Sequence, residues 1–285
     1  MQRFRNLAKI LLPYFEIINL IQKYFRGSII SYSVFETGKV KSSKEDFSDV
    51  GIIIQGPLLK RKNFTIKSIK YYLNSYPGVR IYLSTWDTID KHNLKNLKKL
   101  PITVILNKKP ANTGRGNVFL QIKTTTVGLE AARIDKCKYV AKVRSDQGFF
   151  ENYALQLLKS IVCQKNVNSK IVTTYFNTIH NRDYSISDQF QFGEIDSIYS
   201  FWNGVSNKLQ IHLIPEIHLT SRYYTKLNMQ NISYFEFLKT YFILINENSI
   251  GLVWFKSTIE DLSSRRRRSK KFEHFNDFTW REITK

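Results

Sequence analysis

Two polar segments of the sequence directly follow apolar runs, and one of them contains a guanidinium group and a carboxylate. Arg144-Ser145-Asp146 follows the apolar run 138–143 (KYVAKV), and Gln55-Gly56-Pro57-Leu58 follows the apolar run 50–54. A guanidinium group binds phosphate through paired hydrogen bonds, and a carboxylate can hold a divalent ion with phosphate oxygens and water as further ligands. The two segments are therefore candidates for a ligand site, in which Arg144 either pairs with Asp146 or binds a phosphate. A helix cap or a strand-end turn is the structural alternative for each of them.

Two further polar segments follow apolar runs. These are 84–87 (STWD) and 107–117 (NKKPANTGRGN), of which the second is basic, contains glycine and leads into a helical pattern. Backbone N–H groups at such a helix start suit a phosphate. The sequence contains no GxGxxG, GxxxxGK[ST], HExxH or GxSxG pattern. Dinucleotide, P-loop, zinc-protease and α/β-hydrolase signatures are thereby excluded.

Three carboxylates are candidates for a general base. Asp188 lies in SISDQFQFG just before a strand-like alternating segment, and we rank it first. Glu216 opens a helical stretch after Pro215 and ranks second, and Glu194 ranks third. A purely structural role is the alternative for each.

The elements that would position these residues alternate between strand and helix. Apolar runs at 50–54, 80–85, 102–106 and 138–143 are separated by helical patterns at 64–76, 89–100 and 118–134. Such alternation predicts parallel strands joined by right-handed crossovers. Ligands of such sheets bind beyond the carboxyl ends of the strands, where the polar segments above lie.

Six ordered motifs carry a resemblance to a known family, the WavE family of lipopolysaccharide-synthesis proteins. The resemblance implies a GT-A-type glycosyltransferase, with a Rossmann-like sheet that binds a nucleotide-sugar. The predicted fold is thus α/β, with a mixed, mostly parallel sheet and flanking helices. The motifs are IIIQGPL (52–58), YPGVRIYLSTW (76–86), GNVFLQIKTTTVGL (116–129), YVAKVRSD (139–146), SDQFQFG (187–193) and PEIHL (215–219).

The resemblance also implies a donor site with a divalent ion, Mn²⁺ or Mg²⁺, held at Asp146 on the diphosphate. Two positions depart from the family pattern: Leu120 stands where an arginine is expected, so that Arg115 or Lys123 would replace it, and Asp-x-Asp is reduced to Arg144–Asp146. Asp188 and Glu216 remain the candidates for the base. The expected donor-binding residues are Gln55, Gly56, Pro57, Thr85, Trp86, Asp87, Arg115, Asn117, Gln121, Arg144 and Asp146.

Charge and the two chain ends indicate an acidic partner. Lys and Arg number 44 against 23 Asp and Glu, a formal net charge of +21. Residues 3–26 form an amphipathic helical pattern that either packs on the core or lies on an anionic membrane, and 265–271 (RRRRSKK) is a basic cluster. We expect three regions: helix and linker (1–48), glycosyltransferase domain (49–256) and basic aromatic tail (257–285). The two cysteines form no zinc motif and fit a reducing compartment.

The resemblance, together with these observations, implies a glycosyltransferase that is peripheral to the cytoplasmic face of the bacterial inner membrane. Its partners would be a nucleotide-sugar donor, a lipopolysaccharide, O-antigen or capsule precursor as acceptor, and the anionic membrane surface, without nucleic acid. Two alternatives remain open at this stage. One is a basic module that binds nucleic acid or an anionic polymer without chemistry, and the other is a nucleotidyltransferase. Carboxylates after strand ends favour an enzyme.

Overall fold

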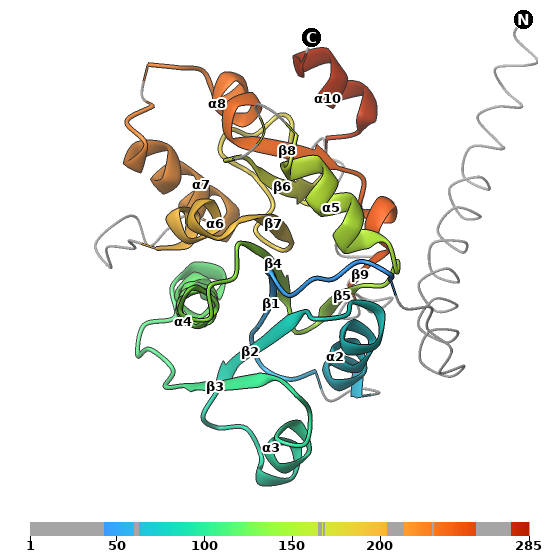
Figure 1. Cartoon of the computed structure of the whole chain (residues 1–285). Helices are drawn as coiled ribbons and strands as arrows, with labels where there is room; N and C mark the ends of the chain where they lie inside the picture. Colours follow the sequence, from blue (N-terminus) through green and yellow to red (C-terminus); the bar gives the residue numbers. More distant parts are fainter. Residues whose placement is uncertain are drawn as a thin grey trace, which may run out of the picture. The chain divides into compact units, whose positions relative to one another are not determined.

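A seven-stranded mixed sheet forms the centre of the structure, with strand order β3-β2-β1-β4-β7-β6-β8 (Figure 1). The computed structural model describes residues 43–59, 63–164, 167, 169–203, 214–229, 231–254 and 275–284. These residues belong to a single unit of the chain, Ser42–Lys285. The predicted terminal helix 3–26 and the basic cluster 265–271 lie outside the described residues.

The parallel half of the sheet matches the predicted strands closely. Its strands are β1 (Val50–Gln55), β2 (Arg80–Trp86), β3 (Thr103–Asn107) and β4 (Tyr139–Arg144). In register, Ile52 of β1 pairs with Ile81 of β2 and with Ala141 of β4. Every residue of β1 is buried, which explains its continuous apolar run, because a parallel strand covered on both faces has no solvent side.

The other half of the sheet reverses direction. Strand β7 (Gln191–Glu194) runs antiparallel to β4, β6 (Ile171–Thr174) is antiparallel to β7, and β8 (Phe242–Ile245) is parallel to β6. A small second sheet pairs β5 (Gln147–Phe149) with β9 (Leu252–Trp254). The predicted mixed, mostly parallel sheet is therefore confirmed, with Asp146 two residues after the end of the central strand β4.

Helices cover both faces of the sheet. Helix α4 (Val118–Ile134) packs on the parallel strands so closely that a Cβ at Gly128 would lie 2.5 Å from Ile53 Cγ2. It lies beside α6 (Ile195–Trp202), which in turn contacts α7 (Pro215–Lys226), whereas α2 (Phe64–Ser75) and α5 (Ala154–Val162) lie on the opposite face (Figure 1). Short 3-10 turns, η2 (Arg115–Asn117) and η3 (Glu247–Ile250), connect the larger elements.

Helix α3 (Lys91–Leu97) is shorter than the predicted 89–100. Asp90 caps it, since its carboxylate accepts the N–H of Asn93 at 2.8 Å, and only Leu97 of this helix is buried. A helix with so little apolar contact gains no packing energy from a longer span. No helix within the described part of the chain is long and apolar enough to cross a membrane.

The end of the described chain packs against the domain. Helix α10 (Asp277–Thr284) contacts α8 (Tyr234–Tyr241), and the N–H of Phe275 donates to the carbonyl of Thr178 at 3.0 Å. Phe275 is 2% exposed and belongs to the apolar core. The predicted limits at 49 and 256 stay predictions.

Candidate functional site

Arg144 and Asp146 form a paired ion contact directly beyond the carboxyl end of β4. Arg144 Nε and Nη2 each donate to one Asp146 carboxylate oxygen, both at 2.9 Å. Burial by itself would lower the pKa of Arg144, but the hydrogen bonds and charge of Asp146 outweigh it and raise that pKa. Arg144 therefore stays charged, and its guanidinium group is held in one orientation with about a fifth of its side chain exposed.

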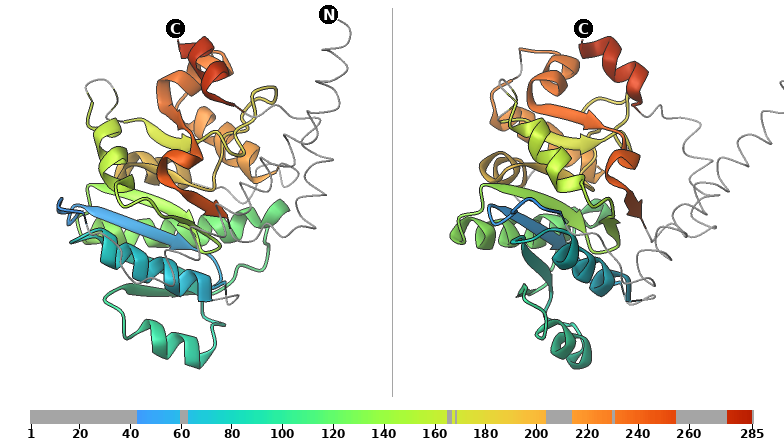
Figure 2. Two further views of the ribbon diagram at one scale, coloured as in Figure 1. Left: turned by 90° about the vertical axis from the view of Figure 1, so that its right-hand side faces the viewer. Right: turned by 45° about the vertical axis from the view of Figure 1, so that its right-hand side comes forward.

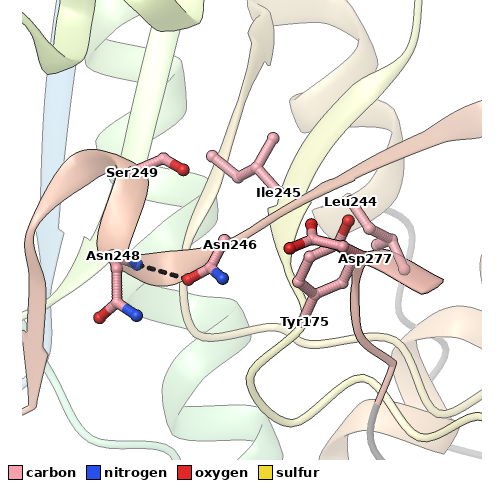
Figure 3. Close-up of a pocket in the computed structure, with 7 residues that line it drawn as sticks. All are labelled: Tyr175, Leu244, Ile245, Asn246, Asn248, Ser249 and Asp277. Carbon is pink, nitrogen blue, oxygen red and sulfur yellow. Dashed lines mark hydrogen bonds between the residues drawn. The ribbon is translucent and has the colours of Figure 1, made fainter. Parts of the chain in front are cut away.

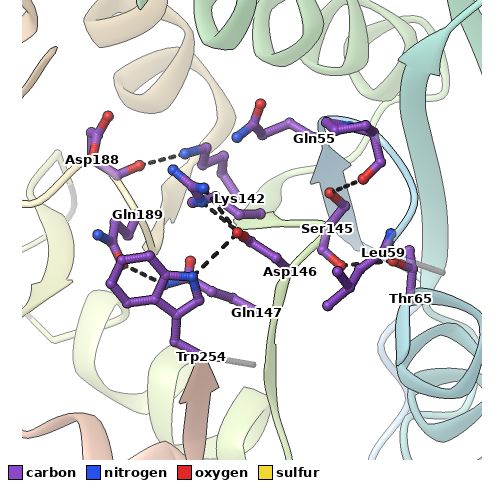
Figure 4. A network of polar contacts seen from close by, with 12 residues as sticks. Gln55, Leu59, Thr65, Lys142, Ser145, Asp146, Gln147, Asp188, Gln189 and Trp254 are labelled. Atoms are coloured by element: carbon purple, nitrogen blue, oxygen red, sulfur yellow. Dashed lines mark hydrogen bonds and ion pairs between the residues drawn. The ribbon is translucent and has the colours of Figure 1, made fainter. Parts of the chain in front are cut away.

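The small second sheet brings a tryptophan to this ion pair. Because β9 pairs with β5, Gln147 lies opposite Trp254, and the Trp254 indole N–H donates to Asp146 Oδ2 at 3.2 Å (Figure 4). The Arg144 guanidinium lies 5.7 Å from the centre of the Trp254 ring. Sequence reasoning missed Trp254, although the strand-like run 251–255 (GLVWF) after the aromatic segment was a usable signal.

The turn after β1 lies beside the turn after β4. The N–H of Ser145 donates to the Gln55 carbonyl at 2.9 Å, and the Ser145 hydroxyl donates to the Pro57 carbonyl. Gly56 has φ of 110°, and a Cβ there would lie 3.1 Å from Ser145 Oγ, so the turn requires glycine. Gln55 is buried, and its Oε1 accepts from Thr124 of α4 at 3.0 Å. The structure therefore brings Gln55–Pro57 and Arg144–Asp146 together.

A fully buried lysine links the central strand to the segment that carries Asp188. Lys142 donates to the Asp188 backbone carbonyl (Figure 4). Its ammonium lies 4.5 Å from the centre of the Trp202 ring. Burial lowers the pKa of Lys142 to about 7, an effect only partly opposed by the charge of Asp188. The Asp188 side chain is buried as well, and its Oδ2 has no hydrogen-bond partner among the described residues. The position of Lys142 inside the apolar run KYVAKV was a signal that this lysine is buried, but sequence reasoning did not use it.

Glu216 approaches the same cluster from the first turn of α7. The turn at η2 packs against this helix start, because a Cβ at Gly116 would lie 2.8 Å from Pro215 Cδ. Burial, followed by the charge of Asp188, raises the pKa of Glu216 to about 7. The positive charges of Arg182 and then Arg144 act in the opposite direction on that pKa, and the pKa of Arg144 is itself raised. Glu216 thus lies in the electrostatic range of Asp188 and of two guanidinium groups, of which Arg144 is fixed by Asp146.

The other predicted donor-site residues lie farther from the ion pair. Thr85 and Trp86 are buried on β2, which is separated from β4 by β1, and Asp87 follows them at the surface. The α4 residue Gln121 is buried, with Oε1 unpartnered among the described residues. Arg115 and Asn117, at the two ends of η2, are exposed.

Glu194, the third candidate for the base, lies at the wrong end of the sheet. The antiparallel register pairs Glu194 with Tyr139, the first residue of β4, whereas Asp146 follows the last. The ranking of Glu194 as a base is therefore corrected.

The Asp146 carboxylate is already engaged by neighbouring hydrogen-bond donors in this arrangement. Both of its carboxylate oxygens already accept hydrogen bonds from Arg144, and Oδ2 also accepts from Trp254. No group of three His, Cys, Asp or Glu side chains among the described residues could hold a metal ion. Mn²⁺ or Mg²⁺ stays a prediction, and Arg144 is the cation that these residues themselves supply.

A separate hollow of about 530 Å³ lies at the carboxyl ends of β6 and β8 (Figure 3). It includes none of the residues of the ion pair or of the Gln55–Pro57 turn, so we assign the chemistry to the strand ends of β1 and β4 and not to this hollow. Its lining residues are Tyr175, Leu244, Ile245, Asn246, Asn248, Ser249 and Asp277.

Several solved structures are similar to the chain at low sequence identity. A glycosyltransferase involved in glycosylation of the major capsid protein of PBCV-1 is 12% identical, with 78% of this chain and 98% of that chain covered and a TM-score of 0.43. A mannosyltransferase from Pyrobaculum calidifontis, in complex with GDP-Man and Mn²⁺, is 10% identical, with 89% of this chain and 71% of that chain covered and a TM-score of 0.46. A cytidylyltransferase from Leptospira borgpetersenii is 15% identical over 82% and 93%, with a TM-score of 0.41. The fold assignment rests on strand order and register and not on these likenesses.

No curated protein matches the chain. The family model described as WavE lipopolysaccharide synthesis matches residues 50–210. This range runs from the first residue of β1 past the end of α6, and it includes the turns that carry Gln55, Arg144, Asp146 and Asp188. The chain belongs to the WavE lipopolysaccharide-synthesis family.

Proposed function

We propose that the protein is a glycosyltransferase that moves a sugar from a nucleotide-sugar to a lipopolysaccharide, O-antigen or capsule precursor. The observation that carries the proposal is the position of the Arg144–Asp146 ion pair. It lies at the carboxyl end of the central strand, next to the Gln55–Pro57 turn and in the electrostatic range of the Asp188 and Glu216 carboxylates. Membership of a lipopolysaccharide-synthesis family supports the substrate class.

Arg144 would bind the diphosphate of the donor. In the transfer, the acceptor oxygen bonds to the anomeric carbon as the bond from that carbon to the diphosphate oxygen breaks, so negative charge grows on the leaving group. A guanidinium group already fixed by Asp146 and Trp254 stabilises that charge without reorganisation. A divalent ion, where one binds with the donor, would supply further charge.

Asp188 or Glu216 would accept the proton that the acceptor hydroxyl loses. A base works best when its pKa lies near the working pH, which favours Glu216, whose pKa is raised to about 7. Asp188 has a buried carboxylate oxygen without a partner in the described part of the chain, so it offers an accepting atom. Both residues stay candidates, and Asp188 keeps its first rank until variants separate them.

The predicted setting is the cytoplasmic face of the bacterial inner membrane, where a lipid-linked acceptor is accessible. The predicted amphipathic segment 3–26 and the basic cluster 265–271 would bind the anionic surface. The nucleotidyltransferase alternative would place a glycine-rich basic loop directly after the first strand, where this chain has Gln55–Pro57.

The test is a thermal-shift screen with UDP-, GDP-, CMP- and dTDP-sugars, with and without Mn²⁺, followed by a transfer assay with the donor that binds. A ligand of the native state raises the melting temperature by mass action. We expect one donor class to stabilise the wild type and an Arg144→Gln variant to lose that shift. The matched control is Arg133→Gln, since Arg133 pairs with Asp196 on the surface. If no nucleotide-sugar binds while a nucleoside triphosphate does, the nucleotidyltransferase reading replaces this one.

A further inference from the structure

One edge of the domain is basic and carries no acidic residue over a long stretch of sequence. Between residues 91 and 129 the chain has eight Lys or Arg residues and no Asp or Glu. Six of these cations belong to α3, its C-terminal end and the segment that follows β3, and we call them the lysine edge. They are Lys91, Lys95, Lys98, Lys99, Lys108 and Lys109, and all six are exposed.

The lysine edge stands apart from the rest of the domain. Strand β3 is the outer strand of the sheet, and α3 lies beyond it, at the end of the domain opposite α8 and α10 (Figures 1 and 2). Lys91 and Lys108 both follow the carboxyl ends of neighbouring strands, because β2 and β3 pair in parallel up to Trp86 and Asn107. The edge therefore extends along α3 and around the end of β3.

None of the six lysines pairs with an acidic group of the described residues. Elsewhere on the domain, Lys159 pairs with Glu45 and Asp49. The nearest acid in sequence, Asp90, is engaged in capping α3. The cations of the edge thus remain available to an external anion.

The spacing on α3 aligns the lysines on one side of the helix. Lys91 and Lys95 are four residues apart, and Lys98 and Lys99 follow Lys95 by three and four residues. Side chains at these spacings are neighbours along one stripe of a helix. Like charges at these spacings destabilise an isolated helix. The stripe is therefore a cost to the fold, which a partner of opposite charge would offset.

We propose that the lysine edge is a docking surface for an anionic phospholipid membrane. Its residues are lysines, which act as compact charges toward diffuse headgroups, whereas a surface that reads nucleic-acid bases is richer in arginine. No aromatic residue occurs between Asp87 and Val118, so the edge lacks the stacking platforms that single-stranded nucleic acid needs. Leu106 of the outer strand is 44% exposed beside it and can enter the headgroup layer.

This inference rests on the proposed function for its purpose, because a lipid-linked acceptor would be reached at the bilayer. Vesicle binding needs no turnover, so the two can fail separately. A protein that binds nucleotide-sugars but not vesicles would refute only the docking surface. A protein that binds vesicles but not nucleotide-sugars would refute only the proposed glycosyltransferase function.

The experiment uses the full chain in co-sedimentation with vesicles of phosphatidylcholine containing phosphatidylglycerol, at low salt. The edge variant is Lys95→Gln with Lys99→Gln. The matched control is Lys70→Gln with Lys136→Gln, two exposed lysines outside the edge. Each lysine near an anionic surface contributes about fivefold to partitioning, so we expect the edge variant to bind about 25-fold more weakly and the control to bind like the wild type. Added salt should reduce this difference.

Several results would overturn the proposal. Equal binding by the edge and control variants would refute it, as would a wild type that does not bind the anionic vesicles. Binding to pure phosphatidylcholine as strong as to the mixed vesicles would remove the electrostatic basis. An edge variant that keeps vesicle binding but loses binding to a single-stranded oligonucleotide would reassign the edge to nucleic acid.

Discussion

The buried lysine of the central strand makes the free energy of unfolding depend on pH in a definite direction. Burial lowers the pKa of Lys142 to about 7 in the folded state, against about 10.5 when the chain is unfolded. Between these values the unfolded chain binds more protons than the folded protein, so stability rises as pH rises. Below pH 7 both states carry the proton, and the cost of the buried charge is constant.

The size of the effect follows from these two pKa values. One proton changes the free energy of unfolding by at most about 1.4 kcal/mol per pH unit. Between pH 6.5 and pH 9, Lys142 should therefore add about 2–3 kcal/mol of stability. Lys142→Met removes the titrating group but keeps an apolar side chain of similar length, so the variant should lack this increase.

The assay is urea denaturation at pH 6.5, 7.5 and 9, followed by tryptophan fluorescence, to which Trp202 beside Lys142 contributes. The quantity compared is the change in unfolding free energy with pH, not its absolute value, so any loss of the Asp188 contact cancels. Lys70→Met, at an exposed lysine of α2, is the matched control and should follow the wild type. A Lys142→Met variant that gains stability with pH as the wild type does would refute the burial argument.

Three further predictions concern the site and the membrane. Asp146→Asn should lower turnover at least about 100-fold with the fold intact, since Arg144 loses its anionic partner, and activity within threefold of wild type would contradict this. If Glu216 is the base, activity should rise with pH through about 7, and Glu216→Gln should abolish that rise. If Asp188 is the base, Asp188→Ala should lower kcat by ~10²–10⁴ with little change in donor affinity. Deleting residues 1–26 should make binding to anionic vesicles sensitive to salt, because the remaining attraction is electrostatic; salt-resistant binding by this deletion would argue against the helix.

Local pattern was sufficient for the first half of the domain. The parallel strands and α4 were predicted nearly residue by residue, because buried strands need continuous apolar runs and helices need apolar residues at a period of 3.6. The same pattern located Gln55–Pro57 and Arg144–Asp146 at strand ends, and parallel pairing then brought them together. The length of helix α3 was overestimated, because a periodic pattern does not reveal whether a helix has a packing partner.

The sequence by itself thus determined the alternation of strands and helices in the first half of the domain, the polar strand ends and the excess of positive charge. Only tertiary structure decided strand direction in the second half. Because β7 runs antiparallel to β4, Glu194 lies at the far end of the sheet from Asp146. Trp254 reaches Asp146 across 108 residues through the pairing of β9 with β5, and Lys142 is enclosed by Trp202 and the Asp188 segment. Contacts of this kind depend on which distant segments pair, and no local periodicity encodes that choice.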